Sequence, residues 1–207
     1  MTKTTFKKTI QNLTHDQIVS LLLDLFTDSK LFRDIISSRL SESDADDALG
    51  KYVSRLEKSF NKLHSFSLSS CKSIVAEYES IAPTDRYKAV INYWFAFYAA
   101  EFSRTYGDID SPFYNALVKA GLKTIEYSGT DRDFYELWHD RIEDLISTCG
   151  YFGWGVEEDL KRAFIDVELK WFDEDESADE GVDDGLNDSD ETGSAAPVET
   201  SDERDGS

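Results

Sequence analysis

Apolar side chains recur every three to four residues along most of the chain, which is the period of an amphipathic helix. In residues 13–29 this stripe starts directly after Thr14 and Gln17, a pair that is typical of a capping box. The period-two alternation of a half-buried strand is missing. The pattern therefore predicts an all-α fold of about eight helices, in residues 13–29, 31–40, 41–66, 67–83, 84–107, 111–129, 131–150 and 153–174.

The helix expected in residues 84–107 differs from the others because it is apolar on nearly all sides between Val90 and Phe102. A helix of this kind is usually buried on most of its surface. We expect it to be the central helix, with the remaining helices packed around it as stacked hairpins or as an irregular bundle. No strict repeat is visible, which favours the irregular bundle.

Charge divides the chain into two parts. The 207 residues carry a formal net charge of −20, and residues 173–207 hold 15 acidic residues against one basic residue, Arg204. The apolar period also stops at Asp173. We expect residues 1–172 to form one helical domain and residues 173–207 to be a disordered acidic tail. Because the body is itself net negative, direct binding of nucleic acid is not expected.

The cysteines and the apolar runs give expectations about location. Cys71 and Cys149 are far apart and belong to no paired motif, which fits a reducing compartment. The N-terminus has no apolar core of a signal peptide. The longest apolar run, Ala89–Ala100, is shorter than the about 20 residues that cross a bilayer. These features predict a cytoplasmic protein that does not enter a membrane.

The stretch between Tyr106 and Asn115 breaks two apolar runs with glycine, aspartate and proline. One interpretation is structural: Gly107 ends a helix, Asp110 or Ser111 caps the next one, and Pro112 occupies its first turn. The other is chemical, because Asp108 and Asp110 could ligate a hard cation or share acid/base work. We favour the structural interpretation, since two carboxylates leave a cation without further ligands.

A second unusual stretch, Cys149–Gly155, carries three glycines before a helix. Glycines at a helix start can cradle a phosphate. Here three carboxylates follow directly and would repel it; they are Glu157, Glu158 and Asp159. We therefore expect a tight turn that lets Phe152 and Trp154 pack inward.

The sequence shows no nucleotide-binding loop and no serine-hydrolase motif, and we expect no cofactor. The three histidines, His15, His64 and His139, lie on three separate predicted segments. No metal site is expected from them.

Three short motifs carry a resemblance. The segments LTHDQIVSLLLDLF, EFSRTYGDIDSPFYNAL and GYFGWGVEEDL, with their YGDI, PFYN and GWG marks, make residues 10–170 resemble an uncharacterised family of small all-helical, mostly bacterial proteins described as a domain of unknown function. The resemblance implies an all-α domain of stacked helical pairs. It implies no catalytic residue, and so leaves the function open.

These observations favour a noncatalytic interaction or adaptor module with an unknown protein partner. Its binding surface is expected at helix ends, on Tyr106, Phe113, Tyr114, Asn115, Phe152 and Trp154. One alternative is a metal-dependent or acid/base enzyme that uses Asp108, Asp110 and the carboxylates of residues 157–159. Another is an acidic decoy that binds a basic protein through its tail.

Overall fold

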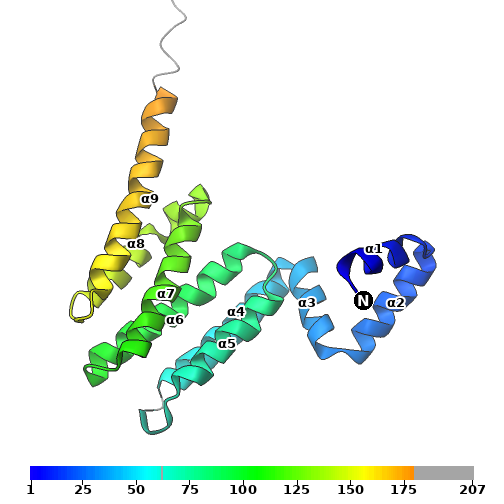
Figure 1. The fold of residues 1–207 in the computed structure, drawn as a ribbon, viewed down its shortest axis with the longest axis horizontal. Helices are drawn as coiled ribbons and strands as arrows, with labels where there is room; N and C mark the ends of the chain where they lie inside the picture. The colour runs from blue at the N-terminus through cyan, green and yellow to red at the C-terminus, as the bar shows by residue number, and fades with distance from the viewer. Residues whose placement is uncertain (62, 180–207) are drawn as a thin grey trace, which may run out of the picture. The chain divides into compact units, whose positions relative to one another are not determined.

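The computed structural model describes residues 1–61 and 63–179, and these form α-helices, one short 3-10 helix and no strand. The all-α fold predicted from the sequence is confirmed. The chain divides into two units, Met1–Phe172 and Asp173–Ser207. The described helices (Figure 1) are α1 (Lys3–Gln11), α2 (His15–Asp28), α3 (Lys30–Leu40), α4 (Glu42–Phe60), η1 (Leu63–Ser65), α5 (Leu68–Ile81), α6 (Asp85–Tyr106), α7 (Ser111–Ser128), α8 (Arg132–Cys149) and α9 (Val156–Asp179).

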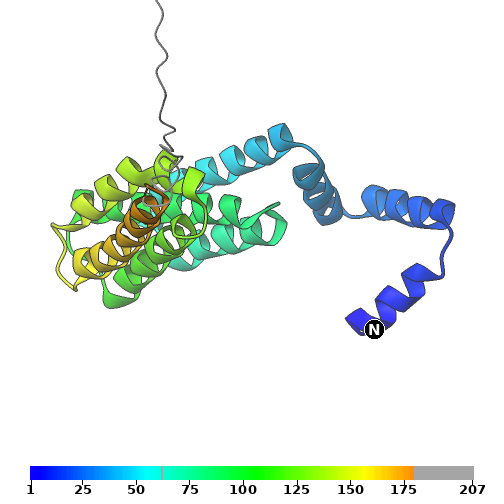
Figure 2. The same cartoon turned by 90° about the horizontal axis from the view of Figure 1, so that it is seen from above.

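Helix α6 is the centre of the core. It packs against α4, α5, α7 and α8 (Figures 1 and 2). Its buried side chains are spread around its circumference. Aromatic rings from α4 and α6 meet here, for example Phe60 and Phe95 with ring centroids 5.7 Å apart. Burying such large rings contributes much of the hydrophobic stabilisation of a domain. The nearly all-apolar segment between Val90 and Phe102 therefore occupies the place expected for it.

Helix α9 is held against the end of α7. The indole Nε1 of Trp171 donates to the Ser128 carbonyl at 3.1 Å, and Lys170 Nζ donates to the Gly129 carbonyl at 2.6 Å. About three turns closer to its start, α9 lies so near α7 that a Cβ on Gly121 would meet Leu160 Cδ2 at 2.7 Å. Glycine at this position allows the two helices to approach.

Several helix ends follow the local sequence rules. Thr14 and Gln17 form the expected capping box, with distances of 2.9 and 3.3 Å. Gly107 ends α6 with φ of 88°, a backbone conformation that side-chain-bearing residues rarely adopt. Of the two candidate caps of α7, Asp110 is the one used: its Oδ1 accepts from Phe113 N at 3.0 Å.

Two helix boundaries differ from the sequence expectation. Helix α1 was not expected, because its segment offers only Phe6 and Ile10 as bulky apolar positions. A local cap stabilises it: Thr2 Oγ1 accepts from Thr5 N at 3.2 Å. Helix α9 continues to Asp179, past the position at which the apolar period stops. Acidic side chains lower the hydrophobicity of a segment without forbidding a helix. Residues 180–207 of the expected tail lie outside the described residues.

We call the first two helices, α1 and α2, the arm. Arg33 of α3 joins α2 and α3 by donating to the carbonyls of Phe26 and Thr27 at 3.0 and 2.7 Å. No residue of α1 or α2 is buried. Across the described residues, none of the helices has both the length and the hydropathy that a membrane span requires.

Candidate protein-interaction surface

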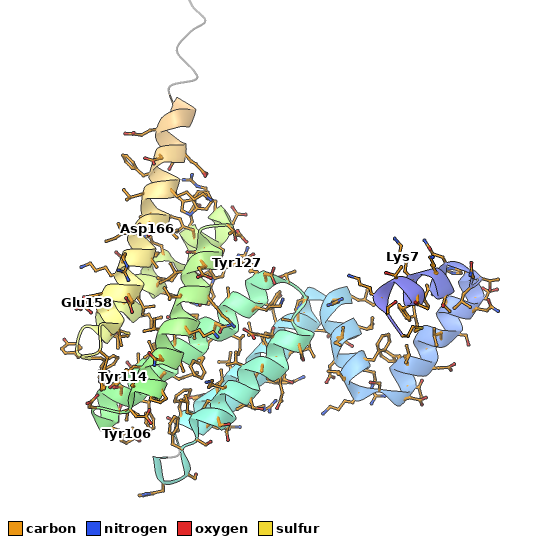
Figure 3. The ribbon with its side chains drawn as sticks, viewed as in Figure 1. Lys7, Tyr106, Tyr114, Tyr127, Glu158 and Asp166 are labelled. Carbon is orange, nitrogen blue, oxygen red and sulfur yellow. The ribbon has the colours of Figure 1, made fainter. Side chains whose placement is uncertain are left out.

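Two turns that are distant in the sequence lie together at the junction of α6, α7 and α9. Trp154, in the turn between α8 and α9, donates its indole N–H to Asp108 Oδ1 at 3.1 Å. The ring of Tyr114, on α7, lies between the two turns, with centroids 6.1 Å from Trp154 and 5.8 Å from Phe152. Figure 3 shows Tyr106 and Tyr114 at this end of the helices. The regions that the sequence nominated as a binding surface are thus adjacent in space.

Two of the residues that the sequence predicts for this surface lie in the interior beneath it. Tyr114 and Phe113 are buried. The Tyr114 hydroxyl forms a 2.7 Å hydrogen bond with Ser103 Oγ and accepts from the backbone N–H of Ile109 at 3.3 Å. Their side chains therefore fix the turn after α6, whereas contact with a partner requires the exposed residues around them.

The exposed part of the surface is aromatic. Trp154 is 60% exposed, Tyr151 is 85% exposed and Tyr106 is 44% exposed. The expectation that Trp154 packs inward is wrong, although Phe152 is half-buried as expected. The backbone explains the difference, because Trp154 has φ of 69° and its side chain lies against Asp108 and Tyr114. A tryptophan in this left-handed region is strained.

A cavity of about 420 Å³ opens beside Trp154, between α7 and the start of α9. We call it the aromatic pocket; six of its lining residues are Tyr114, Asn115, Val118, Leu122, Trp154 and Val156. Its volume falls within the range of about 300–1,000 Å³ that is usual for ligand pockets. This cavity is therefore lined by three of the residues that the sequence predicts for the binding surface, Tyr114, Asn115 and Trp154.

The carboxylates considered for catalysis have separate structural partners. Asp108 accepts from Trp154, Asp110 caps α7, and Asp159 pairs with Arg162 at 2.8 Å. In the described part of the chain, Asp108, Asp110 and the carboxylates of residues 157–159 form no group of three whose oxygens lie within 4.8 Å of one another. The convergence that the enzyme alternative requires is not found among these residues.

A different titratable cluster surrounds His139, and the sequence analysis missed it. His139 Nδ1 lies 3.3 Å from Asp140 Oδ1, and its Nε2 lies 3.2 Å from Glu168 Oε1 on α9. Glu143 Oε2 lies 3.8 Å from Nδ1 of His139. This pair is visible in the sequence, because Glu143 follows His139 by one helical turn. Ligand atoms of His139, Asp140 and Glu143 lie within 4.8 Å of one another.

This arrangement is better suited to holding a proton than a metal ion. Burial lowers the pKa of His139, but hydrogen bonds to Asp140 and Glu168 and the charge of Glu143 outweigh burial, and the net pKa is raised. Both ring nitrogens already face carboxylates, as an imidazolium requires. We interpret the cluster as an ion network that joins α8 to α9.

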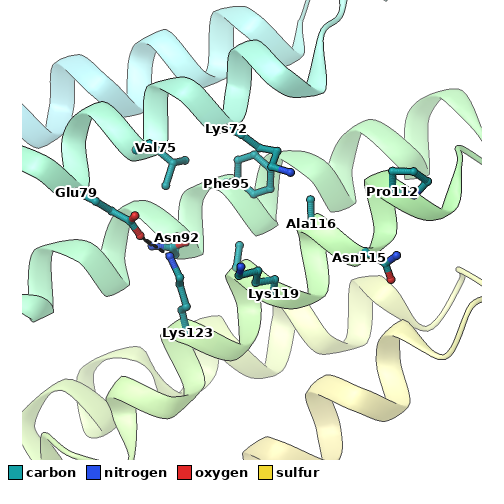
Figure 4. A pocket seen from close by; sticks show the side chains of 12 residues that line it. Lys72, Val75, Glu79, Asn92, Phe95, Pro112, Asn115, Ala116, Lys119 and Lys123 are labelled. Atoms are coloured by element: carbon teal, nitrogen blue, oxygen red, sulfur yellow. Dashed lines mark hydrogen bonds and ion pairs between the residues drawn. The ribbon is translucent and has the colours of Figure 1, made fainter.

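A second cavity, of about 550 Å³, lies between α5, α6 and α7 (Figure 4). It shares Asn115, Lys119 and Lys123 with the lining of the aromatic pocket. At its end, Glu79 Oε1 accepts from Asn92 Nδ2 at 2.7 Å and from Lys123 Nζ at 2.6 Å. Burial alone would raise the pKa of Glu79, but these two hydrogen bonds and the positive charge of Lys123 lower it. The network ties three helices together, so we assign it a structural role.

Both cysteines are buried free thiols. Burial raises the pKa of Cys71 to about 11 and that of Cys149 to about 12. A thiol of this kind is protonated at neutral pH and is a poor nucleophile. Neither cysteine is therefore a catalytic candidate.

Comparison of the chain with protein-family models, with curated proteins and with solved structures finds no match. The resemblance based on the YGDI, PFYN and GWG marks stays a prediction. A functional proposal for this chain therefore depends on the geometry of its own residues.

Proposed function

We propose that this protein is a noncatalytic interaction module that binds a protein partner at the aromatic pocket and the exposed rings beside it. The observation that carries the proposal is Trp154. This side chain is 60% exposed, yet a hydrogen bond to Asp108 and the neighbouring ring of Tyr114 hold it in place.

An exposed tryptophan that is already fixed is well suited to binding. Tryptophan and tyrosine are enriched among the residues that contribute most to protein–protein affinity. Fixing a side chain in advance reduces the conformational entropy that is lost on association. The strained backbone of Trp154 supports the same view, because strain of this kind concentrates at functional positions.

The lining of the aromatic pocket indicates which side chains a partner segment would need. Its walls include Val118, Leu122 and Val156, while Lys119 and Asp159 also line it. A partner segment with one apolar side chain for the pocket and polar groups on either side would satisfy this lining. We further propose that binding takes place in the cytoplasm, because the two free thiols fit a reducing compartment.

The test is quantitative affinity capture from native cytoplasm with the full-length chain, its Trp154→Ala variant and a Phe172→Ala control. Phe172 is an aromatic residue of similar exposure, 58%, on α9. We expect Trp154→Ala to lose the captured partner at least tenfold and Phe172→Ala to keep it. Thermal unfolding of both variants checks that they fold. Equal capture by the wild type and the folded Trp154→Ala variant would contradict the proposal.

A second candidate function, the acidic decoy, is favoured by one observation, the 15 acidic residues among residues 173–207. It predicts that a chain ending at residue 179 no longer binds a basic protein, and that binding by the full chain weakens steeply as salt is raised. Capture that persists after this truncation would exclude it and leave the aromatic pocket as the binding site.

A further inference from the structure

Helices α1 and α2 carry large apolar side chains that the rest of the described chain leaves well exposed. None of their residues is buried, although α2 alone has seven bulky apolar positions. Soluble proteins rarely leave so many neighbouring apolar side chains in water. Those on α1, α2 and the start of α3 that are 38–61% exposed are Phe6, Val19, Leu21, Leu22, Leu23, Leu25, Phe26 and Leu31.

The other described helices do not bury these apolar side chains. Helix α2 shares an extended contact only with α3, and α1 shares one with no described helix. A helix of 14 residues is marginal in water by itself, so α2 depends on packing for its stability. The apolar positions of α2 cover a wider sector than one neighbouring helix can bury. A further surface is needed to stabilise it.

The charges of the arm indicate what that surface is. Helix α1 has three lysines and no acidic residue, whereas α2 has three aspartates and no lysine or arginine. None of these six side chains forms an ion pair within the described residues; Figure 3 shows Lys7 on α1. The six are Lys3, Lys7, Lys8, Asp16, Asp24 and Asp28.

We propose that the arm formed by α1 and α2 is a dimerisation surface whose occupant is the same arm of a second copy of this chain. In a two-fold dimer each surface meets its own copy, so α1 of one chain lies on α2 of the other, twice. This pairing covers the apolar side chains and places the lysines of each chain beside the aspartates of the other. It goes beyond the proposed function, because it involves neither the aromatic pocket nor its partner.

Other occupants fit these observations less well. A helix that binds an anionic membrane surface carries lysine or arginine on its polar face, and α2 carries aspartate there. Helix α1 could reach its own α2 through residues 12–14, but in the structure the two share no extended contact. The area suits a dimer: with on the order of 80 Å² open on each, the eight side chains offer about 600 Å² per chain, against roughly 800 Å² in a standard interface.

The first experiment measures the mass of the full-length chain in solution by sedimentation equilibrium over a wide concentration range. We expect a monomer–dimer equilibrium for the wild type and at least a hundredfold weaker association for Leu22→Asp. Leu137→Asp on α8 is the matched control, because Leu137 is 67% exposed and lies outside the arm. We expect it to dimerise like the wild type. A wild-type chain that stays monomeric at all concentrations would overturn the proposal.

The second experiment reverses the charges. Lys7→Glu with Lys8→Glu makes both helices of the arm acidic, and Asp24→Lys with Asp28→Lys makes both basic. Each double variant alone should lose dimerisation, and an equimolar mixture should restore it as a heterodimer. If α1 instead packs on α2 of its own chain, mixing restores nothing, and the dimer proposal fails. Circular dichroism of each variant confirms that the helices remain formed.

Discussion

Trp154 donates its indole N–H to the carboxylate of Asp108 across 46 residues of sequence, at 3.1 Å. This one bond joins the turn after α6 to the turn before α9. Because the ring of Tyr114 lies against Trp154 from α7, three segments of the chain fix a single exposed side chain. The Trp154 side chain therefore has a defined position on the surface.

Replacing Asp108 by alanine removes the acceptor and should free the indole. Trp154 is the most exposed of the four tryptophans, so it should dominate the fluorescence that acrylamide can quench. We expect greater quenching in Asp108→Ala and a stability loss below about 1 kcal/mol, as is usual for one exposed hydrogen bond. Asp108→Asn keeps an acceptor oxygen and should behave like the wild type. Identical quenching in the alanine variant would show that the bond does not hold the ring.

Two buried tyrosines should respond in opposite ways to loss of the hydroxyl. The Tyr78 hydroxyl is buried and has no hydrogen-bond partner among the described residues, whereas that of Tyr114 bonds to Ser103 and Ile109. We expect Tyr78→Phe to leave stability unchanged or to raise it by up to about 1 kcal/mol, and Tyr114→Phe to lower it by about 1 kcal/mol. Urea unfolding measures both. A large loss in Tyr78→Phe would reveal a partner for that hydroxyl.

Replacing each of two glycines by alanine should change the stability of the fold in opposite directions. Gly50 lies inside α4, and a Cβ there would meet no atom within 4 Å, so Gly50→Ala should stabilise the fold by about 0.5–1 kcal/mol. Gly107 has φ of 88°, and Gly107→Ala should destabilise it by about 1–3 kcal/mol through backbone strain. The midpoint of thermal unfolding reports both changes. A stabilised Gly107→Ala variant would contradict the left-handed turn after α6.

The ion network of His139 should make stability depend on pH. Because the pKa of His139 is raised in the folded state, its protonation favours folding. The contribution is complete below 6.5, the ordinary pKa of histidine, and is lost as the pH rises through the folded-state value. We therefore expect His139→Gln to destabilise the protein at pH 5.5 and to have little effect at pH 8.5. Glu168→Gln should show the same dependence, and a larger loss at pH 8.5 would contradict this assignment.

The fold was largely predictable from local patterns, and its exceptions have local causes. The capping box at Thr14 and the glycine after α6 are signals that act within four residues. Helix α1 was missed because its few apolar positions give no stripe. The end of α9 was misplaced because loss of the apolar stripe was equated with loss of the helix.

The candidate site was only partly predictable. The sequence nominated both turns, yet Trp154 was expected to face inward, since nothing local reports that Asp108 lies within reach. The cluster at His139 illustrates the same limit, because Glu168 joins it from α9 through packing alone. Residues that meet across distant helices leave no spacing to detect.

The burial of Cys71 and Cys149 has a practical consequence. Thiols that remain protonated and enclosed do not react with alkylating reagents while the surrounding helices stay packed. Each modification event would therefore record a moment when α5 or the end of α8 opens. The chain thus contains two native reporters of transient unfolding, whose alkylation can be read by mass spectrometry without any substitution.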